Sequence, residues 1–153
     1  METLHRWWLW IHLGLIFLGL KFLIFSTLAA IVYLFQSSQL KSHHPGKISL
    51  RIPSLDSIDR FHLVTLFFGI LFFSLGILIG LLWATETHHL GTLFRLPKVP
   101  LSFVTCLMYW AVWAVRVSAL RRGQKIAYST LLLAGLLVVT FVSAYAVPVK
   151  AVI

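Results

Sequence analysis

Four long apolar runs dominate this 153-residue chain and leave few folds open to it. A helix needs about 20 mostly apolar residues to cross a bilayer, and backbone groups in lipid must find their hydrogen bonds inside the spanning structure. The runs predict spanning helices over residues 7–35, 61–84, 101–120 and 126–147. We therefore expect an all-α polytopic membrane protein, in which residues 1–153 form a single integral membrane domain, a four-transmembrane-helix bundle.

The composition agrees with a membrane environment. Hydrophobic residues make up 59% of the chain and charged residues 11%, whereas soluble domains carry about 25% charged residues. The net charge of +9 would suit nucleic acid, but the basic residues stand between apolar runs, and no nucleic-acid-binding motif is present. We expect membrane lipid around the chain and no nucleic acid. The single cysteine, Cys106, excludes an intramolecular disulfide.

The distribution of Lys and Arg predicts the orientation in the membrane. The side that holds the first and third connections carries eight cations, and the other side carries four. Cytoplasmic loops carry the excess of Lys and Arg, so we expect both termini and the loop at residues 83–98 to face outward. The eight are Lys41, Lys47, Arg51, Arg60, Arg116, Arg121, Arg122 and Lys125; the four are Arg6, Arg95, Lys98 and Lys150.

Lys21 stands near the middle of the first predicted helix. A charge at this depth costs roughly 2.5–3.5 kcal/mol on insertion scales. The chain has four carboxylates, Glu2, Asp56, Asp59 and Glu86, and all lie outside the predicted spans. One interpretation is that Lys21 snorkels towards a surface from a helix longer than the bilayer. The other is that it pairs with an external anion: a haem propionate, a lipid phosphate or an acid on another subunit.

Six of the seven histidines fall into two groups. His12 lies one turn inside the first helix, and His88 and His89 lie in the loop at the same predicted surface. His12 is either an interfacial hydrogen-bonding group or a ligand, since two imidazoles can hold a haem iron axially. No Cys or carboxylate cluster completes a zinc site. Three histidines on the opposite side are interpreted as solvated or interfacial: His43, His44 and His62.

Two helix faces carry further patterns. Gly69, Gly76 and Gly80 share one face of the second helix, and such small residues favour close helix packing, either within the chain or in a homodimer. On the third helix, Arg116 is expected to stack on Trp113 at the cytoplasmic interface. No Ser-His-Asp set, P-loop or GxGxxG motif occurs, so the sequence does not predict a conventional hydrolase or nucleotide-dependent enzyme.

Several stretches together resemble a known family. They are RWWLWIH at 6–12, YLFQSSQLK at 33–41, PSLDSIDR at 53–60 followed by FFGILFFSLGILIGLLWATE at 67–86, and LPK at 96–98. Their order and spacing are similar to the C-terminal half of the cytochrome c assembly transmembrane family, the CcsA-type and HemX-like haem-handling proteins. The family's tryptophan-rich WWD signature, which forms its haem platform, falls on HHLGTLFR and is lost here. The family's membrane histidine falls at Ala114.

The resemblance implies a haem site at the outer surface. Of the ligands that the resemblance would supply to this half, only His12 remains, as one axial ligand. His88 or His89, in the loop at the same predicted surface, is the candidate second ligand of a substitute site, unless these histidines are what remains of an abandoned site. His12 and His88 are thus the predicted metal ligands. Arg95, Lys98 or Lys21 would pair with the propionates, because cations bind carboxylates well in a low-dielectric site.

The function implied is non-catalytic. We expect a protein of a bacterial inner membrane, with both termini on the periplasmic side, that assists haem handling or cytochrome c assembly. Its partners would be other membrane subunits or cytochrome c assembly proteins. The alternative is a non-catalytic structural subunit of a larger membrane complex. A transporter is less well supported, since no inverted repeat or broken helix is evident.

Overall fold

Four helices make up nearly all of the described chain. The computed structural model describes residues 2–41, 53–86, 98–118 and 124–146. The helices are α1 (Glu2–Lys41), α2 (Leu55–Glu86), α4 (Lys98–Ser118) and α5 (Gln124–Ala146). Each is long and apolar enough to cross a membrane. The predicted all-α, four-helix architecture is therefore confirmed.

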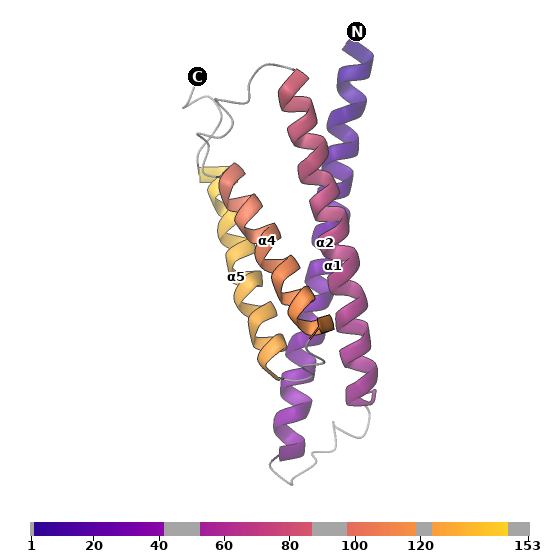
Figure 1. Ribbon diagram of the computed structural model, residues 1–153, viewed down its shortest axis with the longest axis vertical. Coiled ribbons are helices and arrows are strands. Elements are labelled where there is room, and N and C mark those ends of the chain that lie inside the picture. The colour runs from indigo at the N-terminus through magenta and orange to yellow at the C-terminus, as the bar shows by residue number, and fades with distance from the viewer. Residues whose placement is uncertain (1, 42–52, 87–97, 119–123, 147–153) are drawn as a thin grey trace.

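The helices alternate in direction and form two pairs (Figure 1). We call the end at which α1 begins, α2 ends and α4 begins the upper end, and the opposite end the lower end, as drawn there. The long pair α1–α2 extends beyond the shorter pair α4–α5 at the upper end (Figure 1). α4 lies against α2 near the lower end and diverges from it towards the upper end.

α2 begins six residues earlier than the apolar run that predicts it. Ser54 precedes the helix, and its Oγ accepts a hydrogen bond from the backbone N–H of Ser57 at 3.4 Å. This is the N-cap arrangement that satisfies a free N–H of the first turn. Asp56, also in the first turn, favours the positive end of the helix dipole. Hydropathy thus marks the part of the helix suited to lipid, whereas capping decides where the helix starts.

α1 and α2 pack along a seam of glycines. A Cβ added at any of four glycines would lie within 2.6–2.8 Å of an atom of the facing helix. The side chains that α1 places here fit only because these positions lack a Cβ, which confirms packing within the chain as the role of this face. The facing pairs are His12–Gly80, Ile16–Gly76, Gly19–Phe73 and Leu23–Gly69.

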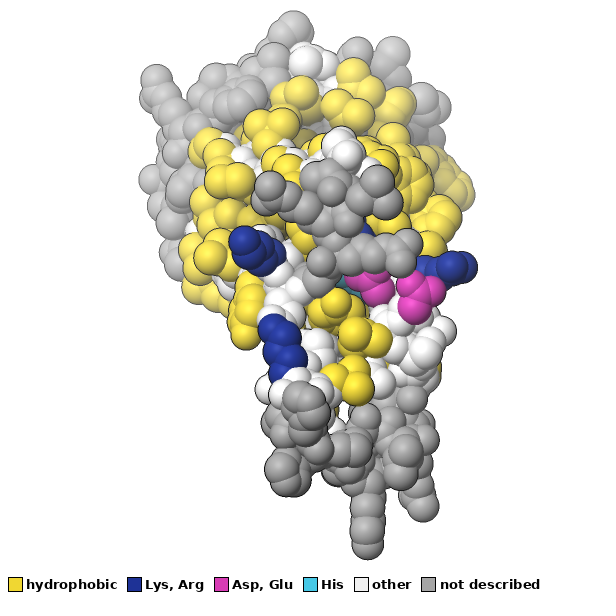
Figure 2. Space-filling view, turned by 60° about the horizontal axis from the view of Figure 1, so that its bottom comes forward, with side chains coloured by type: hydrophobic (Ala, Val, Ile, Leu, Met, Phe, Trp, Pro, Cys, Tyr) yellow, Lys and Arg dark blue, Asp and Glu magenta, His cyan; other side chains and the backbone are white. Residues whose placement is uncertain are grey.

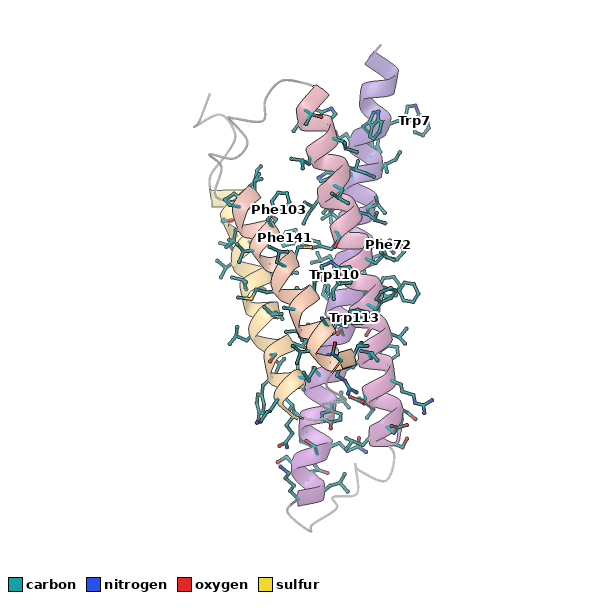
Figure 3. All side chains as sticks on the ribbon, in the orientation of Figure 1. Trp7, Phe72, Phe103, Trp110, Trp113 and Phe141 are labelled. Carbon is teal, nitrogen blue, oxygen red and sulfur yellow. The ribbon has the colours of Figure 1, made fainter. Side chains whose placement is uncertain are left out.

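α4 is joined to α2 by aromatic side chains. Trp110 donates a hydrogen bond from Nε1 to Oγ of Ser74 at 2.9 Å, and the ring of Trp113 lies 5.3 Å from that of Phe67, between centroids. Both tryptophans lie between α4 and α2, whereas Trp7 points away from the bundle (Figure 3). The buried core draws on all four helices: Leu23, Leu66, Ile70, Phe73, Tyr109, Leu133 and Leu137.

Candidate functional site

His12 lies in the upper part of the glycine seam. Its Nδ1 is 2.7 Å from the carbonyl oxygen of Gly76. A Cβ at Gly80 would lie 2.7 Å from Cε1 of the ring and 3.5 Å from Nε2. The missing side chain of Gly80 therefore provides the space for the imidazole, and the Gly76 carbonyl sets its orientation.

This hydrogen bond decides the tautomer of His12. A carbonyl oxygen can only accept, so Nδ1 must carry the proton and donate it. In the neutral imidazole Nε2 then keeps its lone pair. Histidines that bind metals usually donate the other ring N–H in this way, often to a backbone carbonyl. In the half-buried His12, Nε2 is therefore the ring nitrogen that can accept a bond.

The structure describes only two of the other predicted site residues, Lys21 and Lys98. His88, His89 and Arg95 lie outside the described residues. Lys98 is the first residue of α4, so it lies at the upper end. Lys21 is exposed and follows His12 by nine residues, or two and a half turns at 3.6 residues per turn. The two side chains therefore leave opposite faces of α1, and one group bound at His12 would not also reach Lys21.

The lower end holds a buried ion pair that sequence reasoning missed. Arg116 of α4 donates a hydrogen bond from Nη2 to Oδ2 of Asp59 on α2. The side chains are only 7% and 13% exposed, respectively. The structure thus identifies a carboxylate partner for Arg116 that the spacing within α4 did not suggest. Figure 2 shows the lower end, where acidic side chains lie beside Lys and Arg and are bordered by hydrophobic ones.

His62 belongs to the same lower region and corrects an expectation. We interpreted it as solvated or interfacial, but it is buried, with 4% exposure. Its Nε2 is 3.2 Å from Oγ1 of Thr130 on α5, and its backbone carbonyl accepts a hydrogen bond from Ser26 of α1 at 3.4 Å. His62 faces inward because α5 supplies a polar partner there, which no local pattern in α2 reveals.

These polar residues at the lower end form what we call the lower cluster: Asp59, His62, Arg116 and Thr130. One sequence signal could have located it. Asp59, His62 and Thr65 are spaced by three residues, so they share a helix face. Polar residues on one face of a spanning segment usually face the bundle interior. The apolar run of this segment begins at residue 61, so hydropathy alone leaves Asp59 in the loop and hides this helix face.

Comparison with known proteins identifies the family. The family model described as cytochrome c assembly protein matches residues 1–147. The chain belongs to the cytochrome c assembly family. No curated protein and no solved structure matches it significantly. Together with the four apolar helices, membership in this family makes it an integral membrane protein and supports a role in haem handling or cytochrome c biogenesis.

The upper end of this cytochrome c assembly protein is compatible with one side of a haem iron. His12 offers the appropriate nitrogen, held by the Gly76 carbonyl. Among the described residues no group of three or more His, Cys, Asp or Glu side chains gathers as a metal site. Haem needs at most two axial ligands from the protein, so one histidine is enough for one side of its iron.

Proposed function

We propose that this protein binds haem at its upper end and thereby supports cytochrome c assembly without catalysing a reaction itself. The observation that carries the proposal is the hydrogen bond from His12 Nδ1 to the carbonyl of Gly76, 2.7 Å long. It presents Nε2 in the form that binds iron. The proposed orientation puts this end on the periplasmic side of a bacterial inner membrane, following the excess of Lys and Arg at the lower end.

The remaining contacts would come from the neighbouring loop. His88 or His89 is the proposed second axial ligand, and Arg95 and Lys98 are the proposed partners of the propionates. Lys98, at the start of α4, is the described member of this set. Lys21 takes no part, because it leaves the opposite face of α1. The chain's own contribution is to orient one imidazole and to supply cations for two carboxylates.

Haem held in this way would supply a redox-active iron, with the axial ligands and nearby charges setting its potential. The protein residues would bind, orient and partly shield the group. A site that binds haem reversibly in this way suits a protein that holds haem and then passes the haem to another assembly component.

An optical spectrum tests the proposal. The full chain is purified in detergent, supplemented with haem and freed of excess haem. We expect a Soret band with a haem-to-protein ratio near one, and a His12→Gly variant that loses most of it. Imidazole added to His12→Gly is expected to restore the band, since the free ring can occupy the space beside Gly80. A purely structural role for His12 would not give this rescue.

The buried histidine of the lower end, His62, provides the control. His62→Gln keeps a hydrogen-bonding group near Thr130 and lies at the lower end, so its haem content should equal that of the wild type. The proposal is overturned if the wild type shows no Soret band after supplementation. It is equally overturned if His62→Gln loses the band while His12→Gly keeps it.

A second candidate function is a non-catalytic structural subunit of a larger membrane complex. The exposed Lys21, in the middle of a spanning helix, favours this alternative. Blue-native gels and native mass spectrometry of the membrane extract separate the two. A haem-containing monomer supports the first function, whereas a colourless chain in a large assembly supports the second.

A further inference from the structure

Lys21 lies at mid-depth in the bundle. The seam pairs Gly19 with Phe73 and Leu23 with Gly69, so the antiparallel register puts Lys21 level with Leu71. These positions are the midpoints of α1 and α2. The apolar part of α1 begins at Trp7, which is about 21 Å from Lys21 at 1.5 Å per residue. Half of the hydrocarbon core is about 15 Å thick.

Snorkelling is limited for a lysine at this position. An extended lysine side chain reaches about 6 Å from its Cα. In a bilayer centred on the helix midpoints, Nζ would therefore lie roughly 9 Å inside the hydrocarbon, beyond the reach of a lipid phosphate. The glycine seam fixes the register of α1 against α2, so Lys21 does not shift towards a surface without the rest of the pair. An ion pair is the interpretation of Lys21 that this depth favours.

The described chain supplies no counter-ion to Lys21. Asp59 is paired with Arg116 and Asp56 with Arg60, both near the lower end. Glu2 and Glu86 stand at the upper termini of α1 and α2, at least 15 residues away along the helices, which is more than about 20 Å. None of the four acidic side chains of this chain is therefore placed to pair with Lys21.

Lys21 also belongs to an exposed row with a regular spacing. Seven exposed residues of α1 alternate in steps of four and three, which is the a/d spacing of a helix that packs against another helix. The row is about 32 Å long and so covers the hydrocarbon core. A single lysine inside such a row sets register and partner choice. The members are Gly14, Leu18, Lys21, Phe25, Leu28, Val32 and Phe35.

Gly14 extends the row with an open position. A Cβ added at Gly14 would meet nothing within 4 Å, unlike the glycines of the α1–α2 seam. The row therefore lies on a face of α1 that α2 leaves uncovered, and Gly14 allows another backbone to approach closely there.

We infer that this row binds a transmembrane helix of a different protein, which carries an Asp or Glu at mid-depth opposite Lys21. Charge complementarity identifies the occupant, because a carboxylate would remove the cost of an isolated ammonium in lipid. A second copy of this chain does not fit. Packing the row on itself about a two-fold axis brings two Lys21 ammonium groups to the same depth, where they repel each other. The inference stands independently of haem binding.

The test uses a synthetic transmembrane helix as the probe. The purified chain, labelled at its N-terminus, is reconstituted in phosphatidylcholine vesicles with a labelled leucine–alanine helix that has one central glutamate. Association is measured by energy transfer. We expect the central glutamate to strengthen association about tenfold over an all-apolar helix. Moving the glutamate to the end of the probe should abolish this gain.

Three variants separate the possible causes. Lys21→Leu should lose the gain from the central glutamate, and Lys21→Arg should keep it. Lys125→Leu, which removes an exposed lysine near the start of α5, is the matched control and should behave as the wild type. Since Lys21 is exposed, these variants should fold, and circular dichroism checks their helix content.

Other results would overturn the inference. Equal association of the glutamate and apolar probes, or a gain that persists in Lys21→Leu, excludes the ion pair. Energy transfer between two labelled copies of the chain that depends on Lys21 would show a homodimer. A Soret band lost in Lys21→Leu would instead assign Lys21 to haem.

Discussion

The two ends of the bundle are held together by different means. At the lower end polar side chains join helices in several combinations. Asp59 and Arg116 link α2 with α4, and His62 and Thr130 link α2 with α5. Gln124 links α5 with α1 through Ser37, at 3.0 Å. At the upper end α1 and α2 pack through glycines, with one side-chain hydrogen bond from His12.

Because of this difference, we expect the lower end to contribute mainly to the stability of the bundle and the upper end to haem binding. Polar groups buried in a low-dielectric region are costly unless all are paired, so the lower cluster holds the helices in one arrangement. The upper seam relies on close packing, with Nδ1 of His12 bonded to the Gly76 carbonyl and Nε2 proposed as a haem ligand. We therefore expect changes at the lower end to affect unfolding, and changes beside His12 to affect haem more than unfolding.

The largest expected effect comes from breaking the buried ion pair. Arg116→Leu leaves Asp59 buried without this partner and should lower the free energy of unfolding by about 3–5 kcal/mol. The measurement is a detergent-unfolding titration followed by circular dichroism. The matched control is Arg60→Leu, since Arg60 and Asp56 are 79% and 54% exposed and such pairs contribute about 0–1 kcal/mol. Equal losses in the two variants would refute a structural role for the lower cluster.

An intermediate effect is expected from filling the glycine seam at mid-depth. A Cβ at Gly19 would lie 2.6 Å from the backbone nitrogen of Phe73. Since backbone cannot move aside easily, Gly19→Ala should separate α1 from α2 and cost about 1–3 kcal/mol in the same titration. Gly14→Ala, on the same helix with open space around it, is the control and should be nearly neutral. A neutral Gly19→Ala would mean that the seam is looser than the contacts indicate.

The smallest effect on stability, but a clear one on binding, is expected at Gly80. A Cβ there would meet the ring of His12 at 2.7 Å, and the side chain can rotate away. Gly80→Ala should therefore cost less than Gly19→Ala, about 1 kcal/mol or less. It should nevertheless lower haem content, because the ring loses its hydrogen bond to Gly76. Gly135→Ala, where a Cβ meets nothing within 4 Å, controls for both measurements; wild-type haem content in Gly80→Ala would argue against His12 as a ligand.

The sequence predicted the features that depend on local composition. Length and hydropathy of the apolar runs were enough for the four helices, because the need to satisfy backbone hydrogen bonds in lipid leaves few alternatives. The small-residue face of α2 was also visible, since Gly69, Gly76 and Gly80 recur at helical spacing. Helix starts were less accurate, because a cap such as Ser54 lies outside the apolar run.

The site was only partly predictable. His12 was singled out by its position one turn inside the first helix, at the same predicted surface as His88 and His89, but its hydrogen bond to Gly76, 64 residues away, was not predicted. The partners of Arg116 and His62 were missed for the same reason. Asp59 and Thr130 lie on other helices, and local periodicity carries no information about which helices become neighbours.

What the sequence determined alone is the membrane class, the number of helices and the mid-helix position of Lys21, all of which follow from where apolar and charged residues stand along one chain. Only the tertiary structure decided that Gly80 makes room for His12, that Arg116 binds Asp59, and that Lys21 lies on an uncovered face of α1. These are contacts between helices, and they depend on a register that packing sets through the shapes of both partners at once.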